Sequence, residues 1–242
     1  MRIDLLLLDV DGVLVHYQRA QRVLHLAQAL GVPTQAVQAA LYDSGLEAAH
    51  DNGALGSPAY LARLGELLHR TVDVDTWTAA RQAASHPQRA VLQRLQALQL
   101  PMAVLTNNGA LMKQALPSLL PELFPALQGR VFCSADFGLR KPAPEVFLRT
   151  LEMLDAAPAH TLFVDDLFAN VRGARAAGLH AETVHDGRGL GKVLKRYRIG
   201  ESARRDERCN GGTQALEADG SATVSVDQRA AMNAATAARG RF

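Results

Sequence analysis

The chain has 242 residues, of which 48% are hydrophobic and 21% charged, so it is long and apolar enough to bury the core of one sizeable domain. Lys and Arg total 26 against 24 Asp and Glu, and a net charge of +2 is far from the basic footprint of a nucleic-acid-binding protein. The longest aliphatic run, Leu5–Leu8, is much shorter than the roughly 20 apolar residues that span a bilayer. Two cysteines without paired spacing indicate neither a disulfide framework nor a zinc site. Because no secretory signal is visible, we expect a cytoplasmic protein that binds neither nucleic acid nor membrane.

A short strand opens the chain, and a helical segment follows it. The four leucines of Leu5–Leu8 lie between acidic residues and just before Asp11-Gly12, which is typical of a buried strand that runs into a turn. Residues 17–84 carry apolar side chains at helical spacing, interrupted by turns such as Asp51-Asn52-Gly53. This segment shows no strand pattern, so we predict that it consists of short helices alone.

Strands and helices alternate after Pro87. The pattern predicts strands over 101–105, 131–133, 161–164 and 181–184, and helices over 90–98, 111–120, 144–154 and 169–177. Such alternation is typical of an α/β fold, a Rossmann-like parallel sheet with helices on both faces. The glycine-rich residues 187–191 follow the last predicted strand, and we interpret them as a flexible connection.

Residues 201–242 differ from the rest of the chain. They contain few bulky apolar residues, and their positive and negative charges cancel. A segment of this composition can bury little surface, so we predict a disordered or loosely attached tail without a catalytic role.

Polar side chains that suit phosphate and metal binding follow four of the predicted strands. They are Asp9, Asp11, Thr106, Asn107, Lys141, Asp165 and Asp166. In parallel sheets such groups gather beyond the carboxyl ends of the strands, although a single aspartate there is most often a turn or cap residue. Several carboxylates repel one another, and one lysine does not offset them, so the set predicts a divalent cation. Oxygen ligands favour a hard ion, and Mg²⁺ is the usual choice with phosphate substrates.

Four segments carry a family resemblance. In chain order they are Leu8-Asp9-Val10-Asp11-Gly12-Val13, Leu105-Thr106-Asn107-Asn108, Arg140-Lys141-Pro142-Ala143-Pro144-Glu145-Val146-Phe147 and Val164-Asp165-Asp166-Leu167-Phe168-Ala169-Asn170. Over residues 3–195 the chain resembles the haloacid dehalogenase superfamily, specifically its Mg²⁺-dependent phosphohydrolase branch with a small helical cap (subfamily IA-like). An Asp-x-Asp pair alone is a weak signal, whereas the ordered set of four is specific. The resemblance implies a core domain of residues 1–15 and 87–200, with a helical cap of residues 16–86 inserted after the first strand.

The resemblance also implies a role for each site residue. Asp9 would be the nucleophile that forms an aspartyl-phosphate, and Asp11 would protonate the leaving oxygen and then deprotonate water. Thr106 and the backbone N–H of Asn107 would hold phosphoryl oxygens, and Lys141 would bridge the nucleophile and the phosphate.

The expected Mg²⁺ ligands are the side chains of Asp9 and Asp166 and the backbone carbonyl of Asp11. Asp165 would lie outside the ligand set and orient Lys141 or a metal-bound water. Asn170 stands where many relatives have an aspartate, which favours a similar outer role.

Asp11 favours a phosphohydrolase over a dehalogenase, because relatives that remove halide lack an acid at this position. We therefore expect hydrolysis of a small phosphorylated metabolite. Two alternatives stay open. A phosphomutase of the same superfamily would share this core, although the small cap argues mildly against it. A non-enzymatic receiver domain also uses acids, a threonine and a lysine, but its adjacent acids come early in the chain, whereas Asp165-Asp166 come late.

The sequence leaves three properties open, namely the substrate, the oligomeric state and the cap residues that set specificity. His16, Tyr17 and Arg19 lie near the expected entrance, although they could equally be exposed or packing residues of a helix start.

Overall fold

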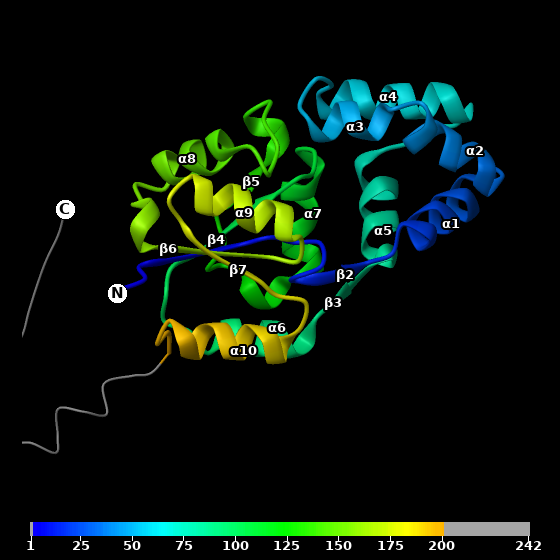
Figure 1. The fold of residues 1–242 in the computed structure, drawn as a ribbon. Helices are drawn as coiled ribbons and strands as arrows, with labels where there is room; N and C mark the ends of the chain where they lie inside the picture. Colours follow the sequence, from blue (N-terminus) through cyan, green and yellow to red (C-terminus); the bar gives the residue numbers. More distant parts are fainter. Residues whose placement is uncertain (1, 201–242) are drawn as a thin grey trace, which may run out of the picture. The chain divides into compact units, whose positions relative to one another are not determined.

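The computed structural model describes residues 2–200, so the predicted tail of residues 201–242 lies outside the described residues. The core is a five-stranded parallel sheet with the order β5-β4-β1-β6-β7 (Figure 1). Its strands are β1 (Leu5–Leu8), β4 (Met102–Thr106), β5 (Val131–Cys133), β6 (Thr161–Asp165) and β7 (His180–Thr183). This sheet confirms the predicted α/β fold class.

Helices cover both faces of the sheet (Figure 1). The α6, α7 and α10 helices share one hydrophobic core with Leu6 and Leu8 of β1, and the α8 and α9 helices share a second core with Leu5 and Leu7. These helices are α6 (Arg89–Gln96), α7 (Leu111–Leu119), α8 (Pro144–Met153), α9 (Phe168–Ala176) and α10 (Gly187–Arg196). Because successive side chains of a strand point to opposite faces, the four leucines supply both cores. Short 3₁₀ turns occupy Pro121–Leu123, Ser134–Asp136 and Pro158–His160.

A helical cap follows the first strand of the sheet. It contains α1 (Arg19–Leu30), α2 (Thr34–Gln38), a π-helical turn at Ala39–Asp43, α3 (Leu46–Asp51), α4 (Ser57–Leu68) and α5 (Val74–Ala84). The α1 and α5 helices pack against each other, as Figure 1 shows. Within residues 2–200, no helix is both long enough and apolar enough to cross a membrane.

The expectation that the cap of residues 16–86 consists of helices alone was wrong at its two ends. The β2 strand (Val15–Tyr17) and the β3 strand (Ser85–Pro87) form an antiparallel ribbon at the base of the cap, with His16 opposite His86. Strands of three residues carry too little alternation to be recognised, and their partners lie about seventy positions apart in the sequence.

The glycine-rich segment after β7 is not a flexible connection, because it forms the first turns of α10. Asp186 caps this helix, since its carboxylate accepts a hydrogen bond of 2.6 Å from the Gly189 N–H. Leu190, Val193 and Leu194 then bury one face of the helix in the core. Capping and packing together outweigh the low helix propensity of the glycines.

Candidate active site

The predicted site residues gather around one hollow of about 320 Å³ at the carboxyl ends of the central strands. Those that line it are Asp9, Asp11, Thr106, Asn107, Lys141, Asp166 and Asn170. Asp165 lies behind the hollow and is fully buried. The structure therefore brings all eight residues to one edge of the sheet, as expected for a parallel α/β fold.

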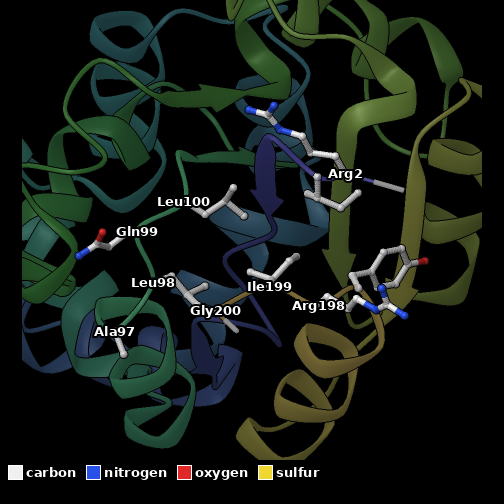
Figure 2. Close-up of a pocket in the computed structure, with 10 residues that line it drawn as sticks. Arg2, Ala97, Leu98, Gln99, Leu100, Arg198, Ile199 and Gly200 are labelled. Carbon is white, nitrogen blue, oxygen red and sulfur yellow. The ribbon is translucent and has the colours of Figure 1, made fainter. Parts of the chain in front are cut away.

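A larger hollow of about 620 Å³ lies at the opposite edge, beside the starts of β1 and β4 (Figure 2). Leu98, Leu100 and Ile199 form part of its wall, together with Arg2 and Arg198. Its lining contains no carboxylate, and the hydroxyl of Tyr197, which also lines it, donates to Glu182 Oε1 at 3.0 Å. The chemistry of the smaller hollow makes it the candidate active site.

The turn after β1 depends on Gly12. This residue has φ of +88°, which favours glycine, and its N–H donates to the Val15 carbonyl at 2.8 Å. A Cβ atom at this position would lie 2.2 Å from the side chain of Asp166. Gly12 therefore both closes the turn and leaves space for Asp166 beside Asp9.

Lys141 lies between two carboxylates. Its buried Nζ is 2.8 Å from Asp9 Oδ1 and 2.7 Å from Asp165 Oδ2. Burial disfavours the charged ammonium, but the attraction of the two carboxylates outweighs it and raises the pKa of Lys141. Lys141 is therefore a fixed positive charge next to the predicted nucleophile.

Asp165 uses both carboxylate oxygens within the protein. Oδ2 accepts from Lys141, Oδ1 accepts from the Leu167 N–H at 2.8 Å, and the Asn170 side-chain amide donates to both oxygens at 3.0 Å. These contacts place Asp165 and Asn170 behind Lys141 and hold its ammonium in position.

The loop after β4 is joined to the Lys141 segment by Asn107. The Asn107 Nδ2 donates to the Lys141 carbonyl at 2.9 Å, and the Lys141 N–H donates to Asn107 Oδ1 at 2.9 Å. Thr106 is buried, and its Oγ1 accepts a hydrogen bond of 2.7 Å from Asn108 Nδ2. The side chain of Asn107 thus binds protein backbone, which leaves its own N–H as the group predicted to contact phosphate.

Three carboxylates form a possible metal site. Asp9, Asp165 and Asp166 each offer an oxygen, and these oxygens lie within 4.8 Å of one another. Burial raises the pKa of Asp9 to about 7, although Lys141 acts in the opposite direction, and the charge of Asp165 adds to the rise. Burial and Asp165 also raise the pKa of Asp166. Lys141 therefore does not fully offset the negative charge, and the oxygen donor set suits a hard cation.

Sequence reasoning missed Arg81. This buried residue of α5 forms an ion pair with Asp11, and its guanidinium also lies 4.1 Å from the centroid of the Tyr17 ring. Nothing in the sequence marked Arg81, because the pair joins residues 70 positions apart. Tyr17, which was noted near the entrance, lines the hollow.

The cap also contacts the core through the end of α3. Asp51 Oδ1 accepts from the Gly109 N–H at 2.8 Å, and the Asp51 carbonyl accepts from Ser134 Oγ at 2.5 Å. Asp51 is part of a turn that the sequence placed between cap helices, but no local pattern indicated its core partners.

Solved structures with a similar fold come from haloacid dehalogenase-like proteins. A HAD family enzyme of Bacteroides thetaiotaomicron has a TM-score of 0.62 and 18% identity, covering 80% of this chain and 99% of that chain. The same enzyme was also solved in complex with magnesium and inorganic phosphate. A predicted HAD-like family hydrolase of Porphyromonas gingivalis has a TM-score of 0.65 and 22% identity, covering 81% of this chain and 98% of that chain. At these identities the likeness shows the fold.

A shorter match concerns the sesquiterpene phosphatase astK of Aspergillus oryzae, which is 43% identical over 49 residues, 20% of this chain and 25% of that protein. This chain thus matches only about a quarter of that relative. The family model of the haloacid dehalogenase-like hydrolases matches residues 3–178, which is most of the chain and includes all four motif segments. The chain therefore belongs to the haloacid dehalogenase-like hydrolase family.

Proposed function

We propose that this protein is a Mg²⁺-dependent phosphatase that hydrolyses a small phosphomonoester through phosphorylation of Asp9. The observation that supports this best is the position of Lys141, whose ammonium contacts Asp9 and Asp165 beside a hollow with a three-carboxylate cluster. A buried carboxylate next to a fixed cation is a nucleophile that needs no base to activate it.

Mg²⁺ fits the residues that are present. The cluster supplies oxygen ligands, and its negative charge exceeds what Lys141 offsets. Asp9 and Asp166 would hold the ion with their side chains and Asp11 with its backbone carbonyl. When bound, the ion supplies positive charge that offsets the repulsion between a carboxylate nucleophile and phosphate oxygens.

The residues of the chain divide the reaction into two steps. In the first, an Asp9 carboxylate oxygen forms a bond to phosphorus while the bond to the ester oxygen breaks, and Asp11 gives a proton to the departing alcohol. The hydroxyl of Thr106, the N–H of Asn107 and the ammonium of Lys141 would bind the phosphoryl oxygens.

In the second step, water attacks the phosphorus of the aspartyl-phosphate. Asp11 takes a proton from this water, the bond from Asp9 to phosphorus breaks, and inorganic phosphate leaves. Both carboxyl groups return to their starting states, so one water is consumed for each ester.

The substrate class follows from the hollow. Its volume of about 320 Å³ suits a small molecule, and most of the residues that line it are polar, with Arg140 and Tyr17 among them. We therefore propose a small phosphorylated metabolite. The relative that acts as a sesquiterpene phosphatase makes an apolar phosphate ester worth including in the test.

The test is a Mg²⁺-dependent assay over a panel of sugar phosphates, nucleotides, other small monoesters and a prenyl monophosphate. We expect phosphate release from at least one polar ester, loss of release with a metal chelator, and loss of turnover in Asp9→Asn. Wild-type turnover in that variant would show that Asp9 is not the nucleophile. A 2-haloacid in the panel distinguishes dehalogenation, and activity on sugar phosphates that requires a bisphosphate would indicate a mutase.

A further inference from the structure

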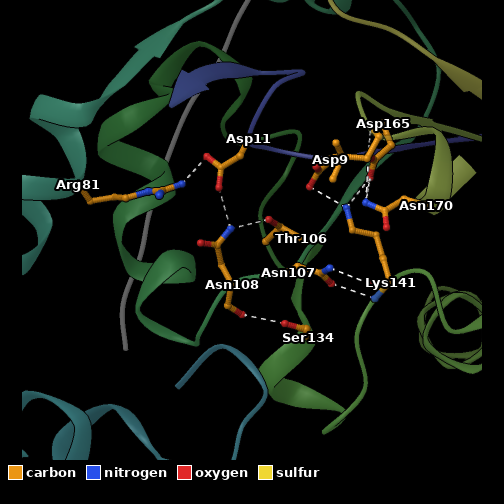
Figure 3. A network of polar contacts seen from close by, with 11 residues as sticks. Asp9, Asp11, Arg81, Thr106, Asn107, Asn108, Ser134, Lys141, Asp165 and Asn170 are labelled. Atoms are coloured by element: carbon orange, nitrogen blue, oxygen red, sulfur yellow. Dashed lines mark hydrogen bonds and ion pairs between the residues drawn. The ribbon is translucent and has the colours of Figure 1, made fainter. Parts of the chain in front are cut away.

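A buried arginine of the cap contacts Asp11, one of the residues that line the site. Arg81 lies in the last turns of α5, and its side chain is only 2% exposed. One terminal nitrogen of its guanidinium pairs with Asp11 Oδ1, as Figure 3 shows. Arg81 does not line the hollow, and its contacts with the lining residues include the ion pair with Asp11.

The other oxygen of Asp11 is held from the core. Asn108 Nδ2 donates to Asp11 Oδ2 at 3.1 Å, and the same nitrogen lies 2.7 Å from Thr106 Oγ1 (Figure 3). The carboxyl group of Asp11 therefore lies between a cap helix and the loop after β4. The amide of Asn108 is shared between Asp11 and Thr106, and its hydrogen bond to Asp11 is the longer of the two. The contact of Asp11 with Arg81 joins two charged groups, so it is the stronger restraint on the carboxyl group.

The local surroundings explain why this restraint is needed. The Asp11 side chain is 30% exposed and stands just before the turn that begins at Gly12, so packing alone restrains its rotamer only in part. The planar guanidinium of Arg81 is buried and lies against the Tyr17 ring, so it is held in place before any substrate binds. A partner held in this way can therefore fix the direction of a partly exposed carboxyl group.

We propose that Arg81 is a positioning residue that sets the direction in which Asp11 presents its carboxyl group to the leaving oxygen. Because Arg81 belongs to the cap and Asp11 to the core, proton transfer to the leaving group then depends on the docked position of α5. This inference rests on the proposed function, in which Asp11 is the acid. It adds a cap residue to the determinants of that step.

The chain offers a matched control in Arg22. Like Arg81, it is a buried cap arginine in an ion pair, with Glu47, and each has an Nε without a hydrogen-bond partner among the described residues. Among the described residues, Arg22 forms no hydrogen bond or ion pair with Asp11, and its partners are Glu47, Tyr60 and Trp77. Arg22→Met therefore measures the general cost of removing a buried cap arginine.

The experiment compares kcat/KM for an alkyl phosphate and for p-nitrophenyl phosphate. For each ester, kcat/KM reports the steps up to release of the alcohol. In those steps only the alkyl ester needs a proton from Asp11, because p-nitrophenolate is a good leaving group without one. In Arg81→Met we expect kcat/KM to fall about 10- to 100-fold for the alkyl ester and by no more than about twofold for the aryl ester. Arg81→Lys should recover part of the loss, and Arg22→Met should affect both esters alike.

A double-mutant cycle completes the test. Asp11→Asn should show the same selectivity, and Arg81→Met/Asp11→Asn should be no slower than Asp11→Asn on the alkyl ester, because both changes remove one function. Equal losses on the two esters in Arg81→Met, or additive losses in the double variant, would overturn the inference. If Asp11→Asn lost activity on the alkyl and the aryl ester equally, Asp11 would not be the acid. That result would contradict the proposed function rather than the role of Arg81.

Discussion

At the scale of single residues, Asp9 and Asp165 differ most clearly in their surroundings and in their proposed roles. Both contact Lys141, but Asp9 lines the hollow whereas Asp165 is fully buried and has all its partners within the protein. The amide of Asn170 donates to both Asp165 oxygens. A buried carboxylate is costly without such donors, so Asn170 is needed for stability as well as for the position of Lys141.

This contact gives the first prediction. Asn170→Leu leaves the Asp165 carboxylate with fewer donors, so the free energy of unfolding should fall by about 1–3 kcal/mol. Turnover should fall as well, because the ammonium of Lys141 is then less well held. Urea denaturation and steady-state assays measure the two effects. Gln96→Leu, which removes an exposed amide, serves as the control, and equal stability of the two variants would contradict the prediction.

Asp51 gives a prediction about pH. Burial raises the pKa of Asp51 to about 7, and the charge of Glu47 adds to the rise, whereas the Gly109 N–H, Arg22 and Arg140 act against it. The folded protein thus holds this proton more tightly than the unfolded chain, where the ordinary value is 3.8. The contribution of Asp51 to stability therefore falls as pH rises from about 4 to about 7 and stays low above that range.

The variant Asp51→Asn keeps an oxygen that can accept from the Gly109 N–H but cannot ionise. Its gain in melting temperature over the wild type should therefore be larger at pH 8 than at pH 5. Melting curves of both proteins in saturating Mg²⁺ measure this, since an ion bound at the proposed site would limit the titration of Asp9. A difference in melting temperature that is constant across the range would contradict the assignment to Asp51.

The sequence allowed us to predict site residues that lie in short motif segments. It did not reveal residues whose role depends on a contact with a partner far away in the chain. Asp9 and Lys141 lie in segments that can be read without the fold, and the strand ends predicted that they would meet. Arg81 contacts a residue 70 positions away and Asp51 one 58 positions away. Neither pairing follows from spacing, because it depends on how the cap is seated on the core.

At the scale of elements, the docking of α3 on the loop after β4 depends on Gly109. A Cβ atom on this glycine would lie 2.1 Å from the ring of His50, a buried residue of α3. The His50 ring stacks on Tyr60 with centroids 4.2 Å apart, so it has little room to move. This close approach requires glycine and allows the neighbouring contact with Asp51.

Gly109→Ala should therefore displace the cap from the core. We expect kcat/KM to fall about tenfold or more, because the cap no longer seats Arg81 and Tyr17 correctly over the site. Gly56→Ala is the matched control in the cap, since nothing lies within 4 Å of its added carbon. Steady-state assays of the two variants measure the effect, and equal activity would show that the His50 contact is unimportant for catalysis.

The elements that the sequence predicted incorrectly share a physical cause. The ribbon of β2 and β3 is stabilised by pairing between distant segments, and α10 is stabilised by the Asp186 cap and by packing on the core. Strand pairing in the ribbon and core packing in α10 are tertiary contacts that outweigh weak local preferences, and the Asp186 cap adds a local hydrogen bond to α10. The central strands were predicted well because continuous apolar runs are a strong local signal.

At the scale of the whole molecule, the sheet order determines where charge accumulates. The β1 and β6 strands are neighbours at the centre, and their carboxyl ends supply Asp9, Asp165 and Asp166. The alternation of strands and helices predicted this meeting. The extent to which burial raises the pKa of Asp9 and Asp166 required the structure, because burial is not visible in a motif.

Mg²⁺ should therefore stabilise the fold as well as support turnover. An ion held by β1 and β6 binds the folded chain and has no equivalent site in the unfolded one, so stability rises with its concentration. The gain is about 2.7 kcal/mol when the free ion is at 100 times its dissociation constant. The melting temperature should rise with MgCl₂ beyond the effect of NaCl at equal ionic strength, since screening alone also weakens carboxylate repulsion.

Asp166→Asn distinguishes this site from other acidic groups. It removes a charge that Lys141 and His185 offset only in part, since burial and Asp165 still raise the pKa of Asp166. The melting temperature without Mg²⁺ should therefore stay the same or rise, while the increase caused by Mg²⁺ should be largely lost. Asp75→Asn changes an exposed acid at the start of α5 and should keep the full increase. An increase that survives in Asp166→Asn would place the ion elsewhere, because without Asp166 the remaining acids of the cluster already share Lys141.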